Sequence, residues 1–235
     1  MFFPKCVILI DMPSIYLLRQ FFPGSYYHVY NRGAHKKNIF HDNKDYLVFT
    51  QILSYYILHP KGKPSSILNR LADKGRTFVE AIETPAYILI AYCLMPNHFH
   101  FMLRQDSDEI TISNLMSRLC TTYAMYYNHR YHHSGTIFQG KYKNILLESE
   151  YHWLYLTKYI HRNPTHLKQR SDLCLYPYSS YQNYLGKRQE RWVNTAMILS
   201  RYSKNPLLEY QSFVEDGGDV GDIERLVLDA EELQD

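Results

Sequence analysis

Two histidines separated by one residue stand in the segment MPNHFHFML, residues 95–103. Alternate side chains of a β-strand point to the same face, so His98 and His100 project together while Phe99 and Phe101 point to the opposite, buried side. Two neighbouring imidazoles can bind a divalent metal ion. The pattern equally suits a strand with polar outer positions, and its spacing alone leaves both interpretations open.

A second chemical pattern stands in KYIHRNP, residues 158–164. Tyr159 and Asn163 are four residues apart, so on a helix they lie one turn from each other on the same face. This spacing places a phenol beside an amide carbonyl near the end of the helix. A packed tyrosine and an asparagine that ends the helix before Pro164 are the structural alternative.

Together, the two patterns supply the parts of one reaction. A tyrosine oxygen can attack the phosphorus of a phosphodiester while a metal ion withdraws charge from the nonbridging oxygens. We expect His98, His100 and the Asn163 side-chain oxygen to hold the metal and Tyr159 to be the nucleophile. A tyrosyl phosphodiester conserves the energy of the broken bond, so this chemistry predicts strand transfer and not hydrolysis.

Three other tyrosines, Tyr123, Tyr126 and Tyr127, also follow the histidines and are rival nucleophiles. None has an amide or an acid four residues later that could complete a metal site. We expect them to pack in the core or to stack on bases.

The elements that must position these residues alternate along the chain. Hydrophobic periodicity and turn residues predict strands at 26–32, 87–94 and 98–103, a strand or extended segment at 136–147, and helices at 42–59, 113–131 and 149–162. The order β-α-β-β-α-β-α indicates an α+β protein with a ferredoxin-like antiparallel sheet and helices packed on one face.

Four segments are expected. Residues 1–23 form an N-terminal segment, 24–172 the catalytic domain, 173–214 an aromatic and helical C-terminal extension, and 215–235 an acidic tail. The longest apolar candidate for a spanning helix, 86–95, is too short to cross a bilayer, so we expect a cytoplasmic protein with no membrane partner. The four cysteines contain no CxxC pair, which argues against a zinc ribbon or a disulfide framework.

Charge is distributed unevenly. The whole chain has a net charge of +3, but residues 215–235 hold nine acidic residues and one arginine, so residues 1–214 carry a net charge of +11. A basic body with 23 tyrosines favours phosphate contacts interleaved with stacking surfaces. An acidic tail of this kind is either a solvated segment or an internal competitor for a basic groove.

Six basic residues near the two patterns are candidates for contacts with DNA phosphates, against the alternative of a solvated surface. They are Arg32, Lys36, Lys37, Lys141, Lys143 and Arg162. We expect single-stranded or hairpin DNA as the partner, because no helix-turn-helix pattern is evident and a sheet with aromatic edges suits stacking of unpaired bases.

The strings MPNHFHFML, KYIHRNP, YHVYNRG and FQGKYK resemble, in a consistent order over roughly residues 24–187, the single-tyrosine HUH transposases of the IS200-like group. The resemblance is to the branch of REP-associated tyrosine transposases in particular. By position, the histidines of that family correspond to His98 and His100, its nucleophile to Tyr159, and its polar third ligand to Asn163. The family often has glutamine in the last position, so the asparagine has a shorter reach.

The resemblance implies a nucleoid-associated enzyme of prokaryotic type that binds folded single-stranded DNA at element ends. It further implies cleavage through a 5′-phosphotyrosine with Mg²⁺ or Mn²⁺. Both a homodimer and a monomer are compatible with the sequence.

Three alternative classes of protein share parts of these patterns. A histidine-triad nucleotide hydrolase would need a third histidine at position 102, where Met102 stands. A non-catalytic RNA- or DNA-binding module shares the sheet topology and the basic, aromatic character. HUH replication initiators and relaxases share the chemistry, although the particular motifs favour a transposase.

Overall fold

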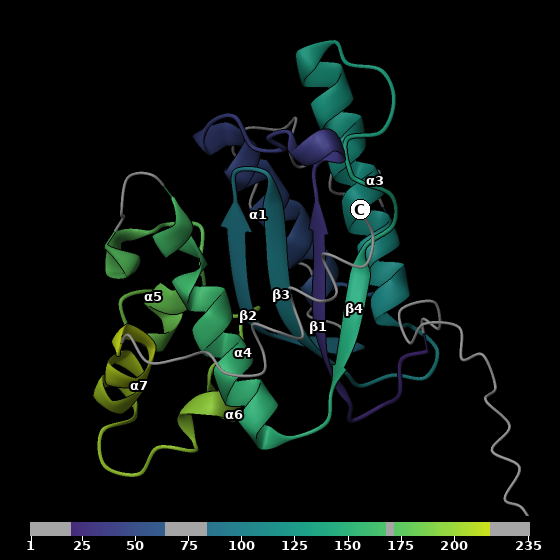
Figure 1. Ribbon diagram of the computed structural model, residues 1–235. Helices are drawn as coiled ribbons and strands as arrows, with labels where there is room; N and C mark the ends of the chain where they lie inside the picture. Colours follow the sequence, from purple (N-terminus) through teal and green to yellow (C-terminus); the bar gives the residue numbers. More distant parts are fainter. Residues whose placement is uncertain (1–19, 64–83, 168–171, 217–235) are drawn as a thin grey trace, which may run out of the picture.

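The computed structural model describes residues 20–63, 84–167 and 172–216. Its centre is an antiparallel sheet of four strands in the order β2-β3-β1-β4 (Figure 1). The strands are β1 (Tyr26–Arg32), β2 (Tyr87–Met95), β3 (His98–Gln105) and β4 (Lys143–Leu147). The larger helices are α1 (Asn43–Leu58), α3 (Ile112–Tyr131), α4 (Glu150–Arg162) and α7 (Pro206–Glu215).

The strand order and the succession β1-α1-β2-β3-α3-β4 are those of a ferredoxin-like fold. The structure therefore confirms the predicted fold class. The predicted bounds of the first strand, 26–32, agree with those of β1, and Pro96 and Asn97 join β2 to β3.

One face of the sheet, here called the packing face, is covered by α1 and α3. Phe99, Phe101 and Leu103 of β3 are completely buried on this face. Leu115 and Leu119 of α3 pack into the same cluster, as their helical spacing predicts. These side chains form an apolar core between the sheet and the two helices.

The opposite face, here called the site face, is covered by α4 and the C-terminal extension (Figure 1). The extension contains α5 (Tyr181–Tyr184), α6 (Ala196–Leu199) and α7. It packs as a second cluster against Ala91, Cys93 and Met102 of the sheet. The third predicted helix thus lies across the sheet from the other two.

Helix starts follow their capping residues. The Asp42 carboxylate accepts hydrogen bonds from the backbone N–H groups of Lys44 and Asp45 and begins α1, as predicted. The Ser149 hydroxyl accepts from the backbone N–H of His152 and begins α4. Helix α3 begins before its predicted start at residue 113, because Thr111 precedes it and its backbone N–H donates to the Asn114 side chain at 2.8 Å.

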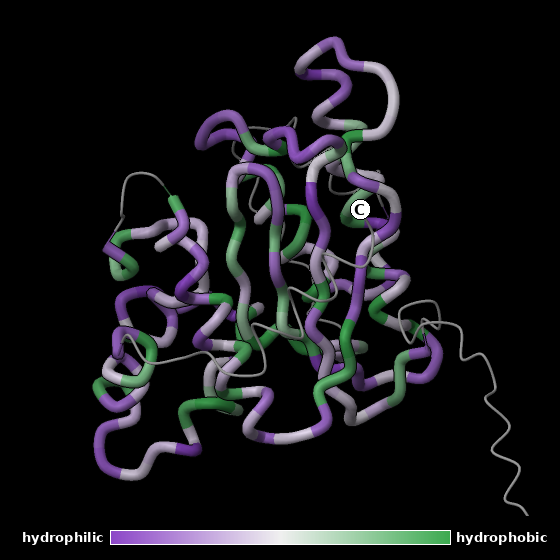
Figure 2. The backbone as a smooth tube through the Cα atoms, in the orientation of Figure 1, coloured by the Kyte–Doolittle hydropathy of each residue, from purple (hydrophilic) through white to green (hydrophobic). Residues whose placement is uncertain are grey.

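The fourth strand is shorter than predicted. Residues 136–142 do not belong to it, and β4 begins only at Lys143. Gly140 adopts a left-handed conformation, with φ of 68°, which turns the chain before the strand. Figure 2 shows that the chain becomes hydrophilic at the end of β1 and the beginning of β3, where the two strands adjoin.

Two predicted segments fall largely outside the described residues, namely most of the N-terminal segment 1–23 and nearly all of the acidic tail 215–235. Among the described helices, none has the length and apolarity needed to cross a bilayer.

Candidate active site

The two histidines of β3 lie on the site face, at the edge of the apolar cluster. His98 is half-buried and His100 is buried, and their ring centroids are 5.1 Å apart. Phe99, between them, points into the packing face. The alternation of side chains therefore separates polar from apolar residues at this point, as the sequence predicts.

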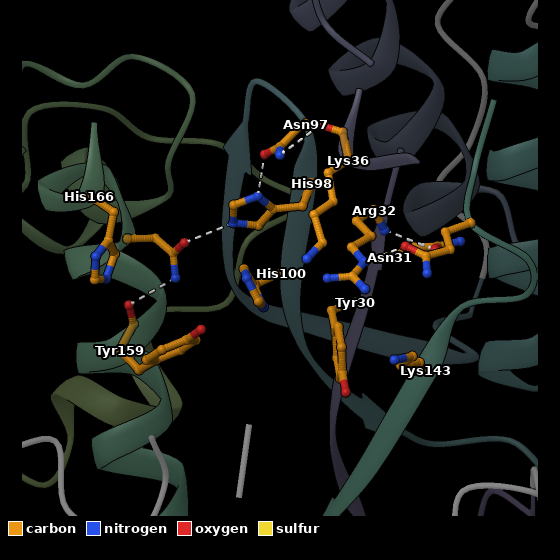
Figure 3. A pocket seen from close by; sticks show the side chains of 12 residues that line it. Tyr30, Asn31, Arg32, Lys36, Asn97, His98, His100, Lys143, Tyr159 and His166 are labelled. Carbon is orange, nitrogen blue, oxygen red and sulfur yellow. Dashed lines mark hydrogen bonds between the residues drawn. The ribbon is translucent and has the colours of Figure 1, made fainter. Parts of the chain in front are cut away.

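The His98 imidazole lies between two asparagine side chains (Figure 3). Its Nδ1 is 2.7 Å from Asn97 Oδ1, and its Nε2 is 3.1 Å from Asn163 Oδ1. The orientation of each amide is set by a bond from its nitrogen, since Asn97 Nδ2 donates to Lys36 O and Asn163 Nδ2 donates to Tyr159 O. Both side-chain oxygens are thus directed toward the imidazole.

A neutral imidazole carries one N–H and satisfies only one of these two oxygens. Burial lowers the pKa of His98, which favours this neutral form. When Nδ1–H donates to Asn97, the lone pair of Nε2 faces the Asn163 oxygen at 3.1 Å. Adjacent ligand atoms of an octahedral divalent ion lie about 3 Å apart, so this pair of atoms fits a bound cation.

His100 lies beside His98 on the same face of β3. Its Nδ1 lies 2.9 Å from Nε2 of His28, on the neighbouring strand β1. Its Nε2 is buried and has no hydrogen-bond partner among the described residues. Burial lowers the pKa of His100 well below its ordinary value, so this imidazole is also neutral at neutral pH.

These donors fit a divalent metal, with two imidazole nitrogens and one amide oxygen. Within the described part of the chain, no group of three or more histidine, cysteine, aspartate or glutamate side chains is arranged to hold a metal. The candidate site therefore depends on Asn163 for its third protein ligand.

Tyr159 extends from α4 toward the strands that carry the histidines (Figure 3). It is half-buried, and its ring meets the His100 ring edge to face with centroids 5.4 Å apart. Asn163 lies one turn later and donates from Nδ2 to the carbonyl of Tyr159 at 3.5 Å. The structure thus brings together the four residues that the sequence singles out as nucleophile and metal ligands, although their roles stay predictions.

These residues line a hollow of about 320 Å³ between the sheet and α4. Three of the six predicted basic residues, Arg32, Lys36 and Lys143, also line it. Arg32 Nε donates to the Gln139 side chain, which holds the guanidinium at the rim. A pocket that combines cations with neutral imidazoles suits a phosphate-containing ligand.

The shape of the chain after β1 places Lys36 at this rim. A side chain at Gly33 would collide with the carbonyl oxygen of Lys37, because a Cβ atom there would lie 2.1 Å from it. His35 and Lys36 both adopt left-handed conformations, with φ of 55° and 58°. Such strained backbone in non-glycine residues is typical of functional sites.

The other three predicted basic residues lie outside the hollow. Lys141 is exposed, and Lys37 lines a separate depression that also contains Tyr127. Arg162 Nη1 donates to the carbonyl of Val214 at 2.9 Å and so ties α4 to the end of α7. The sequence does not reveal this contact, and the DNA-binding role expected of Arg162 stays a prediction.

The rival tyrosines belong to α3, on the packing face. The Tyr123 hydroxyl is buried and donates to the carbonyl of Ile39 at 2.6 Å. Tyr126 donates to the Asp45 carboxylate at 2.9 Å, and the Tyr127 hydroxyl lies 2.8 Å from His41 Nε2. The sheet separates all three from the histidines, which agrees with their expected packing role.

Sequence reasoning misses several residues around the hollow. They are Tyr30, Asn31, Asn97, Gln139 and His166 in its lining and His28 behind His100. The alternation His28, Tyr30, Arg32 in the predicted first strand carries the necessary signal, since these side chains share one face. Their proximity to the histidines depends on the register, in which Tyr30 lies opposite His100 and Arg32 opposite His98.

Comparison with known families gives one match, to the family described as "Transposase IS200 like", over residues 56–163. The comparison with curated proteins finds no match. Among solved structures, the chain is similar to a REP-associated tyrosine transposase bound to a REP hairpin, with 10% sequence identity and a TM-score of 0.49. The match covers 75% of this chain and 95% of that chain. The matched segment 56–163 contains His98, His100, Tyr159 and Asn163, so the chain is similar to the IS200-like transposases over the segment that carries these four residues.

Proposed function

We propose that this protein is a transposase, which cuts and rejoins single-stranded DNA through a covalent bond between Tyr159 and a 5′-phosphate, with a divalent cation bound nearby. The observation that carries the proposal is the convergence of Tyr159, His98, His100 and Asn163 on one basic hollow. Each part of that reaction has a residue of suitable chemistry within the hollow.

In the proposed first step, the Tyr159 oxygen forms a bond to phosphorus and the bond from phosphorus to the 3′ oxygen breaks. The phenol releases its proton, and the departing 3′ oxygen takes one up, so the number of protons does not change. The strand is left with a 3′-hydroxyl, and its 5′-phosphate is joined to Tyr159. Attack by another 3′-hydroxyl reverses the step and joins a new pair of ends.

His98, His100 and Asn163 are the residues that would hold Mg²⁺ or Mn²⁺. When bound, the cation would stabilise the charge that develops on the nonbridging oxygens and favour the phenolate form of the tyrosine. Arg32, Lys36 and Lys143 would hold the phosphate at the rim. The helix α4 fixes Tyr159 and Asn163 relative to each other, so nucleophile and ligand set share one rigid support.

The neighbouring solved structure holds a REP hairpin. For this chain we propose hairpin-forming single-stranded DNA as the substrate, because the basic rim suits a phosphate backbone. The end of the DNA that becomes attached to the protein shows which of the two bonds to phosphorus breaks. A 5′-phosphotyrosine retains the DNA on the 3′ side of the cut.

The test uses the full chain and single-stranded DNA from the two flanks of its gene, labelled at either the 5′ or the 3′ end, with Mn²⁺ or with EDTA. Denaturing electrophoresis should show a protein adduct that carries only the 3′ label, formed with Mn²⁺ and absent with EDTA. Tyr159→Phe should abolish the adduct, whereas Tyr155→Phe, one turn earlier on α4, should leave it. DNA binding without any adduct would favour a binding module, and an adduct that survives in Tyr159→Phe would exclude this nucleophile.

A further inference from the structure

The His28 side chain is a direct polar partner of a proposed metal ligand, yet it does not line the hollow. It is completely buried in the middle of β1, diagonally across the strand pair from His100. Its Nε2 lies 2.9 Å from His100 Nδ1, and the two rings are stacked with centroids 5.1 Å apart. The Tyr30 ring stacks on the His28 ring with centroids 4.7 Å apart and fixes the orientation of this imidazole further.

The hydrogen bond between the two histidines has two alternative directions. His28 donates from Nε2 when its proton is there, and His100 then has its own proton on Nε2. Alternatively, His100 donates from Nδ1, and the lone pair of its Nε2 is available to the hollow. Either way, the buried atoms His28 Nδ1 and His100 Nε2 have no partner among the described residues. The two rings alone therefore do not select a direction.

A cation on His100 Nε2 selects the second direction, because a nitrogen that binds a metal cannot carry a proton. We propose that His28 is a positioning residue that accepts the Nδ1–H of His100 and thereby holds the Nε2 lone pair of His100 toward the metal. This inference rests on the proposed function, since it requires the cation expected there. Outer partners of this kind orient the ligand ring and increase its basicity.

Three substitutions separate this role from mere filling of space. His28→Phe keeps an aromatic ring against Tyr30 but removes the acceptor. His28→Gln restores an acceptor oxygen at about the position of Nε2. His59→Phe is the matched control, because it removes another buried imidazole, one residue beyond α1 and outside the hollow.

Binding of Mn²⁺ to the full-length protein without DNA, followed by electron paramagnetic resonance, gives a readout independent of cleavage. We expect His28→Phe to weaken binding about 10- to 100-fold, as loss of an outer partner does elsewhere. His28→Gln should recover most of the affinity, and His59→Phe should bind as the wild type does. Equal affinity in wild type and folded His28→Phe would overturn the inference.

Nitrogen-15 NMR of the wild-type histidines tests the same point without any substitution. With Mg²⁺ bound, His28 should carry its proton on Nδ1 and show an unprotonated Nε2. A proton on His28 Nε2 in the Mg²⁺-bound protein would contradict the inference, whatever the variants do.

These outcomes separate the inference from the proposed function. A protein whose Mn²⁺ affinity depends on His28 but which never forms a DNA adduct would retain the inference and lose the function. If the protein forms the Tyr159 adduct but its Mn²⁺ affinity is the same in the His28 variants, the proposed function is supported and the inference about His28 is wrong.

Discussion

The two faces of the sheet differ in what they bury. The packing face, under α1 and α3, encloses phenylalanine, leucine and tyrosine side chains in one apolar cluster. The site face, under α4, buries His28, His100 and Asn163 close to Met102 and Leu156. Because adjacent residues of β3 supply both faces, a single strand serves stability with one set of side chains and the proposed chemistry with the other.

This division also determines how each face contributes to the stability of the fold. Buried polar groups reduce stability unless they are satisfied, and the site face keeps at least two buried nitrogens without a partner among the described residues. The packing face compensates by burying large apolar side chains. Substitutions that are alike in chemistry but fall on opposite faces should therefore have opposite consequences.

The largest contrast is expected from one substitution made at two tyrosines. Tyr159→Phe should reduce strand cleavage by about 1000-fold or more, because it removes the attacking oxygen, and should leave the stability nearly unchanged. Tyr123→Phe removes a buried hydrogen bond to Ile39, so it should lower the free energy of unfolding by about 1 kcal/mol and keep the activity. Single-turnover cleavage and urea denaturation measure the two effects. Loss of cleavage in a folded Tyr123→Phe protein would contradict this division.

Neighbouring residues of β3 provide the next contrast. His98→Ala should lower cleavage by at least about 100-fold, because it removes a proposed metal ligand, and should change stability little. Phe99→Ala should lower the free energy of unfolding by about 3–5 kcal/mol, since Phe99 is completely buried. The same two assays apply, with cleavage by Phe99→Ala measured at a temperature where it is folded. Full activity of the His98→Ala protein would contradict the proposed role of a metal bound by His98.

Acid should destabilise the protein through the site side of the sheet. The His161 imidazole is buried between the Tyr210 hydroxyl, 2.6 Å from Nδ1, and Ser180 Oγ, 2.8 Å from Nε2. Burial lowers the pKa of His161 to about 3, whereas an unfolded histidine titrates near pH 6.5. As the pH falls from 6.5 toward 3, only the unfolded chain gains this proton. The free energy of unfolding should therefore fall by up to about 1.4 kcal/mol per pH unit.

Denaturation at a series of pH values between 7.5 and 5 checks this expectation, with His161→Gln as the variant. The variant should be less stable at neutral pH but should lose less stability on acidification. An identical pH dependence in the two proteins would show that His161 is not the group that titrates.

The smallest effect is expected at the rim of the hollow. Lys143 lines the hollow with its ammonium 6.0 Å from the centre of the Tyr30 ring, whereas Lys141 is exposed outside it. Lys143→Gln should weaken binding of single-stranded DNA several-fold and reduce the slope of log affinity against log salt by about one. Lys141→Gln, its neighbour two residues away, should have less effect. Titration of each variant with DNA at two salt concentrations distinguishes the two effects. Equal losses of affinity in Lys143→Gln and Lys141→Gln would contradict binding of the DNA backbone at the rim of the hollow.

The fold was largely predictable because its signals are local. Alternation in 26–32 and 98–103 and the helical spacing of Leu115 and Leu119 give each element without knowledge of the others. The same holds for the grouping of Tyr159 with Asn163, which needs only the pitch of a helix. The separation of the two histidines from Phe99 likewise needs only the alternation of a strand.

The missed features depend on contacts between distant segments. Arg162 is the last residue of α4, and its hydrogen bond to the carbonyl of Val214 joins positions 52 residues apart, which no local pattern reveals. The contact of His28 with His100 requires the pairing of β1 with β3. The face that α4 covers depends in the same way on how the chain crosses the sheet after β4.

The most direct test of the central claim is to identify the residue that becomes bonded to DNA. The full-length protein would be incubated with the cleavable single strand and Mn²⁺, digested with protease and nuclease, and analysed by tandem mass spectrometry for a nucleotide-bearing tyrosine. We expect the phosphonucleotide on Tyr159, on the site face. A phosphonucleotide on Tyr123, Tyr126 or Tyr127 of α3 would contradict this expectation, because the chemistry would then lie on the packing face.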